Sequence, residues 1–303
     1  MIEINFRKVQ FEDKELISDY FWKYPSRSCE RTFVNSFLWA RFYPVTFAIV
    51  ENTLVFKNER EDGCAFSFPA GEAENVKKAI SVLEQYCKER GGTFRFYHVS
   101  ADKFALLEEW YPGRFQIEYN EDIADYVYES EKLATLSGKK LHAKRNHINK
   151  FKQVNEGRWS YESITKDNLE DCFQMALKWR NENGCEDDEE KNAEICVTLN
   201  SLRLFEELEL VGGLLRLDGE IIAFTIGEPI CEDTFVVHIE KAFADIQGAY
   251  PMINQQFVEH ECMKYKYINR EEDTGSEGLR KAKRSYRPVF MVEKGIVTEN
   301  NNI

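Results

Sequence analysis

The sequence predicts an α+β protein of two successive units, each a mixed β-sheet flanked by helices. Segments with strand and helix patterns alternate along all 303 residues, turn residues separate them, and the order before residue 134 is a looser version of the order after it. Apolar residues at 43% and aromatic residues at 14% supply material for a packed core. The length suits two domains, which we place at residues 1–134 and 135–303.

The first unit begins with a helix predicted at residues 13–24, where apolar side chains recur at helical spacing. Residues 43–50 and 53–57 are rich in β-branched and aromatic side chains, and the Glu51-Asn52 pair between them predicts a hairpin. Residues 64–68 have the same strand composition.

A second helix is predicted at residues 74–90, because its apolar residues share one face and Gly91-Gly92 ends it. The remaining expected elements of this unit are a strand at 94–99, a short helix at 103–109, and strands at 115–119 and 125–129.

Residues 132–154 are basic, polar and helix-prone, and we expect one linking helix there. In the second unit the strongest turn signal is Asp218-Gly219, which places a hairpin between strands at 210–217 and 221–227. The other expected elements are a strand at 159–164, helices at 168–183 and 194–207, a buried strand at 234–240, a helix at 250–265, and strands at 267–269 and 290–293. This order matches the acyltransferase architecture called GNAT, so two tandem GNAT-like domains are expected.

The formal net charge is −13, so an anionic partner has to meet a local basic patch rather than the whole surface. No stretch approaches the roughly 20 apolar residues of a bilayer span, and no signal-peptide run opens the chain. The eight cysteines lack the close spacing of a zinc ribbon or redox pair. We expect a cytoplasmic protein with reduced thiols, no metal and no transmembrane segment.

Opposite charges are concentrated at residues 269–288. Four acids fall in the first nine positions, and five bases without an acid fall in the next ten. Arg280, Lys283 and Tyr286 are spaced three apart, so one helical face presents a guanidinium, an ammonium and a phenol. The strand end and loop before them hold three further candidates: Arg270, Glu271 and Asp273. The segment fits a site for a polar or phosphate-bearing substrate, and a solvated helix end is the alternative.

The basic stretch at 138–152 holds six Lys or Arg, two His and no acid. Such a helix suits the phosphates of RNA, of a lipid head group or of a nucleotide, whereas a solvated linker helix is the plainer alternative. The triplet 145–147 is polar without being merely charged, and Asn is a poor helix former. Our candidate phosphate-binding residues here are Lys144, Arg145, Asn146 and His147.

The predicted strand at 234–240 places His238 and Glu240 on one side, as a base and its orienting partner would be; a buried structural histidine is the alternative. The following loop lies where CoA-dependent GNAT enzymes bind pyrophosphate on free backbone N–H groups. Only Gln247-Gly248-Ala249 remains of that motif, so a CoA site is degraded and no cofactor is expected. Asn254, just beyond, is a candidate substrate-binding residue. The acidic run at 186–190 favours a solvated loop over a metal site, because no histidine lies nearby.

Several stretches carry a resemblance to the DUF2156 family, which is similar to the C-terminal domain of phosphatidylglycerol lysyltransferases. These stretches are K-R-N-H-I-N-K-F (144–151), A-F-T-I-G-E (223–228), H-I-E-K-A (238–242), G-A-Y-P-M-I-N-Q-Q-F (248–257) and the segment 268–288. The likeness to the synthases themselves depends on a Gly-Leu-Arg-x-x-Lys…Pro pattern at Gly278, Leu279, Arg280, Lys283 and Pro288.

The resemblance implies a tandem GNAT-like fold as in Fem-type peptidyltransferases, which use aminoacyl-tRNA rather than CoA. It also implies that Arg280 and Lys283 hold a phosphate or polarise the aminoacyl ester carbonyl, and that the helix at 139–152 contacts the RNA backbone. The synthases carry a large membrane flippase region, and nothing in this sequence spans a bilayer. An anionic lipid head group and a soluble or peripheral small acceptor therefore both remain open as acceptors.

We expect an aminoacyl or acyl transferase in which an acceptor hydroxyl or amine attacks an activated ester. Its proton passes to Glu240, His238 or Glu271, and the two bases of the pattern, Arg280 and Lys283, stabilise the oxyanion. Two alternatives stay open, a CoA-dependent N-acetyltransferase and a non-catalytic protein that binds RNA or a phosphate-bearing ligand.

Overall fold

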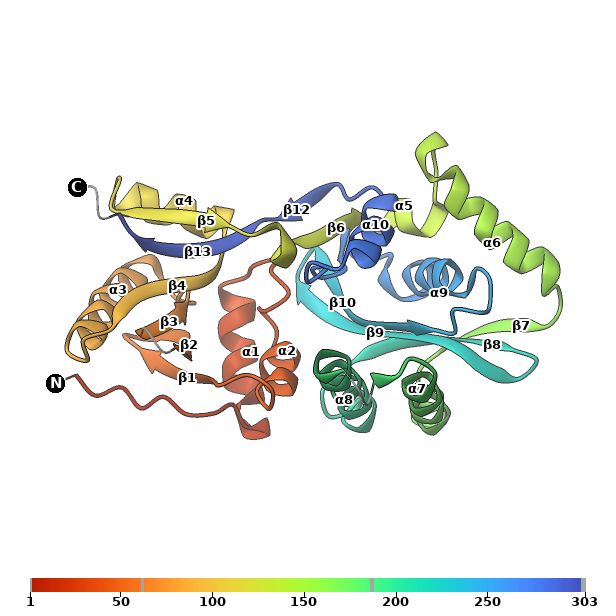
Figure 1. Ribbon diagram of the computed structural model, residues 1–303, viewed down its shortest axis with the longest axis horizontal. Helices are drawn as coiled ribbons and strands as arrows, with labels where there is room; N and C mark the ends of the chain where they lie inside the picture. Colours follow the sequence, from red (N-terminus) through yellow and green to blue (C-terminus); the bar gives the residue numbers. More distant parts are fainter. Residues whose placement is uncertain (1, 61–62, 186–187, 301–303) are drawn as a thin grey trace. The chain divides into compact units, whose positions relative to one another are not determined.

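The protein folds into two compact units (Figure 1), seen in a computed structural model that describes residues 2–60, 63–185 and 188–300. The first unit runs to Asp125 and includes Glu272–Ser276 and the segment from Val292 onward. The second consists of Tyr126–Glu271 and Glu277–Met291. Both units are discontinuous in sequence, whereas the expected domains are continuous, and the boundary at residue 134 stays a prediction.

The first unit holds a six-stranded mixed sheet of order β1-β2-β3-β4-β13-β5. The pair β3 and β4 is parallel, and the other neighbours are antiparallel. The strands are β1 (Val45–Val50), β2 (Thr53–Arg60), β3 (Gly63–Ser67), β4 (Thr93–Ser100), β5 (Phe115–Tyr119) and β13 (Lys294–Glu299). The α-helices are α1 (Lys14–Lys23), α2 (Phe33–Trp39), α3 (Ala73–Lys88) and α4 (Ala101–Trp110), with short 3-10 turns at Phe11–Asp13 and Glu121–Ile123.

The predicted apolar face of α3 forms part of the first unit's core. Ile80 and Leu83 are fully buried, as are Phe66 and Phe96 on the sheet. Each large apolar side chain buried in this way contributes about 1.5 to 3 kcal/mol. The hairpin between β1 and β2 is also confirmed, because Glu51 and Asn52 adopt φ of 48° and 56°, the conformation that a tight two-residue hairpin turn requires.

The second unit holds a seven-stranded mixed sheet of order β12-β6-β11-β10-β9-β8-β7, in which β10 and β11 are parallel. Helix α9 lies on one side of this sheet, and α7 and α8 lie on the other (Figure 1). The strands are β6 (Asp125–Glu129), β7 (Trp159–Ser163), β8 (Val211–Leu217), β9 (Glu220–Cys231), β10 (Thr234–Ala242), β11 (Tyr267–Asn269) and β12 (Phe290–Val292). The helices are α5 (Ser130–Thr135), α6 (His142–Val154) after a 3-10 turn at Lys139–Leu141, α7 (Leu169–Glu182), α8 (Glu189–Arg203), α9 (Ala249–Phe257) continued by a π-helix at Val258–Cys262, and α10 (Glu277–Ser285).

The expected single linking helix at 132–154 is wrong, because the chain turns between α5 and α6. Leu136 and Gly138 have φ of 49° and 94°, outside the helical range. Arg145 closes this turn by donating hydrogen bonds to the carbonyl oxygens of both residues. Lys144, Arg145, Lys150 and Lys152 therefore lie on a separate, shorter helix, α6, whereas Lys139 and Lys140 lie in the 3-10 turn before it.

The predicted α+β class, with two mixed sheets flanked by helices, is confirmed. The sequence patterns missed α2 and strand β13, which lies between β4 and β5. Within residues 2–60, 63–185 and 188–300, no helix combines the length and apolar character needed to cross a bilayer.

Candidate functional site

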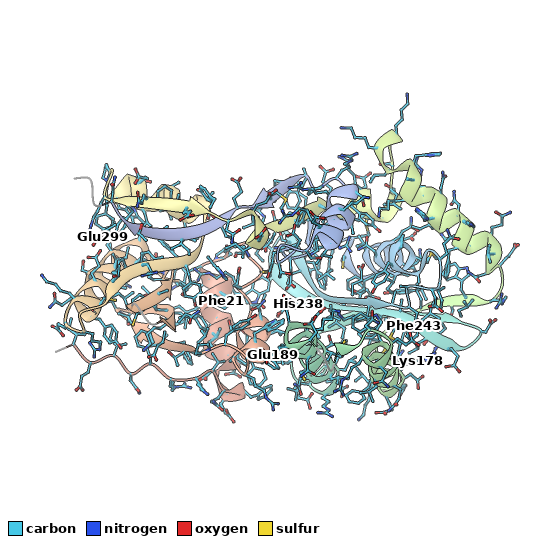
Figure 2. The ribbon with its side chains drawn as sticks, viewed as in Figure 1. Phe21, Lys178, Glu189, His238, Phe243 and Glu299 are labelled. Atoms are coloured by element: carbon cyan, nitrogen blue, oxygen red, sulfur yellow. The ribbon has the colours of Figure 1, made fainter. Side chains whose placement is uncertain are left out.

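A β-bulge in strand β10 sets the position of His238, which is labelled in Figure 2. Val237 pairs with Gly227 and Ile239 pairs with Ile226, which leaves His238 as the extra residue. A β-carbon at Gly227 would lie 2.0 Å from the carbonyl oxygen of Val236, so the close approach of the two strands requires glycine. Bulges re-aim side chains and are common beside active sites.

The imidazole of His238 lies between two carboxylates. Its Nδ1 is 2.7 Å from Glu271 Oε1 and its Nε2 is 2.9 Å from Glu228 Oε1. Burial alone lowers the pKa of an imidazole, but the hydrogen bonds to both carboxylates outweigh it and raise the pKa of His238 to about 10. A ring in this state has no free electron pair for accepting a proton, so the geometry favours a positioning role for His238 over the expected role as base.

Glu240, two residues along the same strand, is held by two hydrogen-bond donors. Arg270 Nη2 donates to its Oε1 at 2.9 Å, and Asn254 Nδ2 donates to its Oε2 at 3.1 Å. The Glu240 and Arg270 side chains are 13% and 11% exposed. Burial lowers the pKa of Arg270, but Glu240 outweighs it and raises the value. The Oδ1 atom of Asn254 is buried without a hydrogen-bond partner among the described residues, an arrangement that a donor group on a ligand or a water would complete.

Lys283 on α10 faces into the second unit, with 8% of the residue exposed. Its Nζ donates to the carbonyl oxygen of Arg270 at 2.7 Å. The hydroxyl of Tyr128 donates to the carbonyl oxygen of Lys283, also at 2.7 Å. These bonds join α10 to strand β6, which carries Tyr128, and to Arg270 just after strand β11, and they place the Lys283 ammonium close to the backbone of Arg270.

The phenol ring of Tyr286 makes cation–π contacts with two side chains. Lys144 Nζ, from α6, lies 4.1 Å from the ring centre, and the Arg270 guanidinium carbon lies 5.0 Å from it. Cations attract aromatic faces by about 0.5 to 2 kcal/mol. Burial raises the pKa of Tyr286, so the phenol keeps its proton. Burial and the nearby Arg270 lower the pKa of Lys144.

The structure thus brings together most of the predicted residues in the second unit, in two neighbouring groups that meet on β10. One is the His238 and Glu271 pair, and the other comprises Glu240, Arg270, Asn254, Lys283, Tyr286 and Lys144. The remaining α6 candidates lie differently. Arg145 is used in the turn described above, Asn146 Nδ2 lies 3.3 Å from His142 Nδ1, and His147 is exposed.

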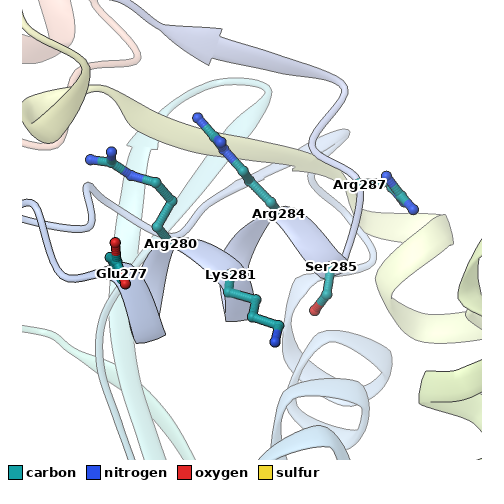
Figure 3. Close-up of a pocket in the computed structure, with 6 residues that line it drawn as sticks. All are labelled: Glu277, Arg280, Lys281, Arg284, Ser285 and Arg287. Carbon is teal, nitrogen blue, oxygen red and sulfur yellow. The ribbon is translucent and has the colours of Figure 1, made fainter.

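Two candidates from the 269–288 segment lie apart from this cluster. Asp273 belongs to the first unit, where its buried carboxylate accepts a hydrogen bond from the Gly275 N–H at 2.9 Å. Arg280 is half-buried on α10, where it helps to line a surface hollow (Figure 3). The roles assigned to these residues from sequence stay predictions.

The loop at 247–249, expected from sequence to be a degraded CoA motif, packs against helix α6. Gly248 has φ of 91°, and a β-carbon there would lie 3.0 Å from both the His147 carbonyl oxygen and Phe151 Cβ. Glycine is therefore required by the close approach of α6, independently of any cofactor. In the acidic run, residues 186 and 187 lie outside the described part of the chain, while Asp188 caps α8 by accepting from the N–H groups of Glu190 and Lys191.

Sequence reasoning missed Glu228 and Tyr128 as parts of the site. Glu228 follows a continuous apolar run in β9, and an acid in such a buried strand is the one available signal. Tyr128 has no comparable signal, because an aromatic residue in a strand is ordinary.

A family described as phosphatidylglycerol lysyltransferase, C-terminal, matches residues 22–297. The chain belongs to this family. It is similar, at 38% identity and a TM-score of 0.90, to a crystallised protein of unknown function from Bacteroides thetaiotaomicron, and the match covers 98% of this chain and 100% of that one.

Two solved structures with lower sequence identity share the fold of this protein. Lysylphosphatidylglycerol synthase (L-PGS) of Bacillus licheniformis matches at 15% identity over 100% of this chain and 95% of its own, with a TM-score of 0.66. The DUF2156 domain of a candidate lysylphosphatidylglycerol synthetase from Agrobacterium fabrum matches at 13% identity over 96% and 92% of the two chains, with a TM-score of 0.66.

Among curated proteins, an uncharacterised protein of Mycoplasmoides gallisepticum is 26% identical over 193 residues. The match covers 62% of this chain and 61% of the relative, so this chain spans less than two thirds of the length of that relative.

Proposed function

We propose that the protein transfers an aminoacyl group from aminoacyl-tRNA to the hydroxyl or amine of a lipid or other small acceptor, at the Glu240 cluster of the second unit. The observation that carries the proposal is a largely buried carboxylate, that of Glu240, whose two oxygens accept hydrogen bonds from Arg270 and Asn254, with the ammonium groups of Lys283 and Lys144 in the same cluster. The family, which is described by its lysyltransferase activity, supports the reaction type.

The cluster suits ester aminolysis or transesterification. The acceptor oxygen or nitrogen forms a bond to the ester carbonyl carbon, its proton passes to the Glu240 carboxylate, and the carbonyl oxygen becomes an oxyanion beside the cations of the cluster. When the carbonyl re-forms, the ribose oxygen of the tRNA leaves and takes a proton. Prepositioned positive charge stabilises such an oxyanion without reorganisation at the moment of reaction.

The basic helix α6 supports a tRNA-linked aminoacyl group as the donor. Lys150 on this helix and Lys139 and Lys140 in the 3-10 turn before it are exposed, and none of them has an ion pair within the described ranges. An acidic protein with one acid-free basic helix offers a local site for a phosphate backbone. Exposed Asn and His side chains on the same helix add hydrogen-bonding groups.

The test uses total tRNA charged with radiolabelled amino acids, mixed with lipid extract, and follows label into the lipid and aqueous product fractions. Wild-type protein should transfer label. The variants Glu240→Gln and Lys283→Met should each lower the transfer rate about 100- to 1,000-fold, as loss of one oxyanion-stabilising or proton-accepting group commonly does. Lys166→Ala, an exposed lysine of the same unit, serves as the control with wild-type rate.

Absence of transfer by the wild type, or wild-type rates in both cluster variants, would reject the proposal. Tight binding of acetyl-CoA in calorimetry would support the CoA-dependent acetyltransferase instead. Salt-dependent RNA binding without any loss of label from charged tRNA would identify a non-catalytic binder.

A further inference from the structure

Helix α10 has two chemically different sides. Lys283 faces inward and contacts the Arg270 backbone. The outer side lines a surface hollow of about 490 Å³ (Figure 3). The residues that line the hollow are Glu277, Arg280, Lys281, Arg284, Ser285 and Arg287.

The hollow is strongly basic in a chain whose formal net charge is −13. Four of its six lining residues are cationic, one is a carboxylate and one is a serine. Figure 3 shows Arg280 and Arg284 extending from the same side of α10, one turn apart, while Lys281 and Ser285 extend from another side. Positive charge is therefore presented on more than one side of α10.

We propose that this hollow binds phosphate groups of a single-stranded nucleic acid segment. Guanidinium groups bind phosphate oxygens through paired, charge-assisted hydrogen bonds. The side chains that line the hollow are charged or hydroxylated, and apolar contact there is limited to their aliphatic stems, whereas interfacial membrane binding uses aromatic and large aliphatic side chains. The identity of the strand as RNA rests on the proposed function, since an aminoacyl-tRNA carries its amino acid at a single-stranded end.

The experiment measures fluorescence anisotropy of a labelled, short, single-stranded oligoribonucleotide at several salt concentrations. The double variant Lys281→Ala/Arg287→Asn removes two cations of the hollow and leaves Arg280 and Lys283 in place. Asn is chosen because Arg287 has φ of 61°, a conformation that Asn tolerates. Affinity should fall several-fold, and the slope of log affinity against log salt should decrease by about one for each phosphate that the variant no longer neutralises.

A second variant tests the sign of the effect. Glu277→Gln removes the single carboxylate of the hollow, so RNA should bind more tightly than to wild type, an outcome that damage to the fold does not produce. The control Lys78→Ala/Lys88→Ala removes the same charge from exposed positions of α3 and should leave affinity unchanged.

Wild-type affinity in the double variant, or no gain from Glu277→Gln, would overturn the proposal. Retention of the wild type on phosphatidylglycerol vesicles, lost in the double variant while RNA binding persists, would overturn it in favour of a membrane surface. Failure of the proposed function is distinguishable from failure of this proposal, because binding to the hollow is measured without charged tRNA and without a transfer reaction. RNA binding that responds to these variants in a protein that transfers no label would keep the hollow and reject the transferase.

Discussion

The His238 imidazolium makes the stability of the second unit depend on pH in a direction that is easy to test. Its side chain is 9% exposed, and its pKa rises from 6.5 to about 10 between Glu228 and Glu271. At about 1.4 kcal/mol per pH unit, this change corresponds to about 5 kcal/mol.

Because the pKa is raised on folding, this contribution is complete below pH 6.5 and is lost as pH rises through about 10. As pH rises from 6.5 to 8, the contribution of His238 to the free energy of unfolding should therefore decrease by about 1.5 to 2 kcal/mol. The variant His238→Gln lacks the titrating ring and should show a smaller decline by that amount over the same interval. Urea unfolding of both proteins at these two pH values gives the difference, and the subtraction removes titrations common to both.

NMR of ¹⁵N-histidine-labelled protein observes the ring directly. One imidazole signal, assigned by its absence in His238→Gln, should keep both nitrogens protonated at pH 8, and Glu228→Gln or Glu271→Gln should each lower its midpoint. A midpoint at or below 6.5, or identical pH dependence in wild type and His238→Gln, would refute the carboxylate clamp.

Two further changes probe the scaffold. Gly227→Ala places a β-carbon 2.0 Å from the Val236 carbonyl oxygen, so urea unfolding should show a loss of about 1 to 3 kcal/mol; Gly278→Ala, with open space around it, is the matched control, and equal stabilities would contradict the bulge geometry. Lys294→Met removes a fully buried ammonium that donates to Glu30 and Asp125 at 2.8 Å, and stability should fall by about 3 to 5 kcal/mol. Because the pKa of Asp125 is already raised to about 6 by burial, the deficit should be larger at pH 7.5 than at pH 5; a deficit equal to that of exposed Lys8→Met would count against the network.

Local patterns were sufficient for most of the fold. The hairpin at Glu51 and Asn52, the apolar face of α3 and the turn at Asp218-Gly219 are encoded by neighbouring residues, so periodicity and turn chemistry found them. Strand β13 was missed because its place between β4 and β5 depends on pairing with residues far away in the sequence. The break between α5 and α6 was missed because Leu136 adopts an unusual conformation that only the Arg145 contacts explain.

The site shows a similar division. The sequence singled out His238, Glu240, Arg270 and Lys283 as candidates, because charged residues in strands and in a glycine-flanked helix are unusual. Their partners followed from three-dimensional contacts instead. Pairing of His238 with Glu271 depends on strand β11 lying beside β10. The burial of Lys283 and Tyr286, next to half-buried Arg280 on the same face of α10, is set by packing that a helical repeat alone does not orient.

The place of β13 has a consequence for synthesis on the ribosome. Arg114, just before β5, and Glu299 at the end of β13 are 185 positions apart yet form an ion pair. At about 5 to 20 residues per second, β4 and β5 wait about 10 to 40 s for the strand that joins them. During that interval the edges of β4 and β5 that later pair with β13 stay open to pairing with other chains. These two unpaired strand edges are therefore a binding target for a chaperone during synthesis.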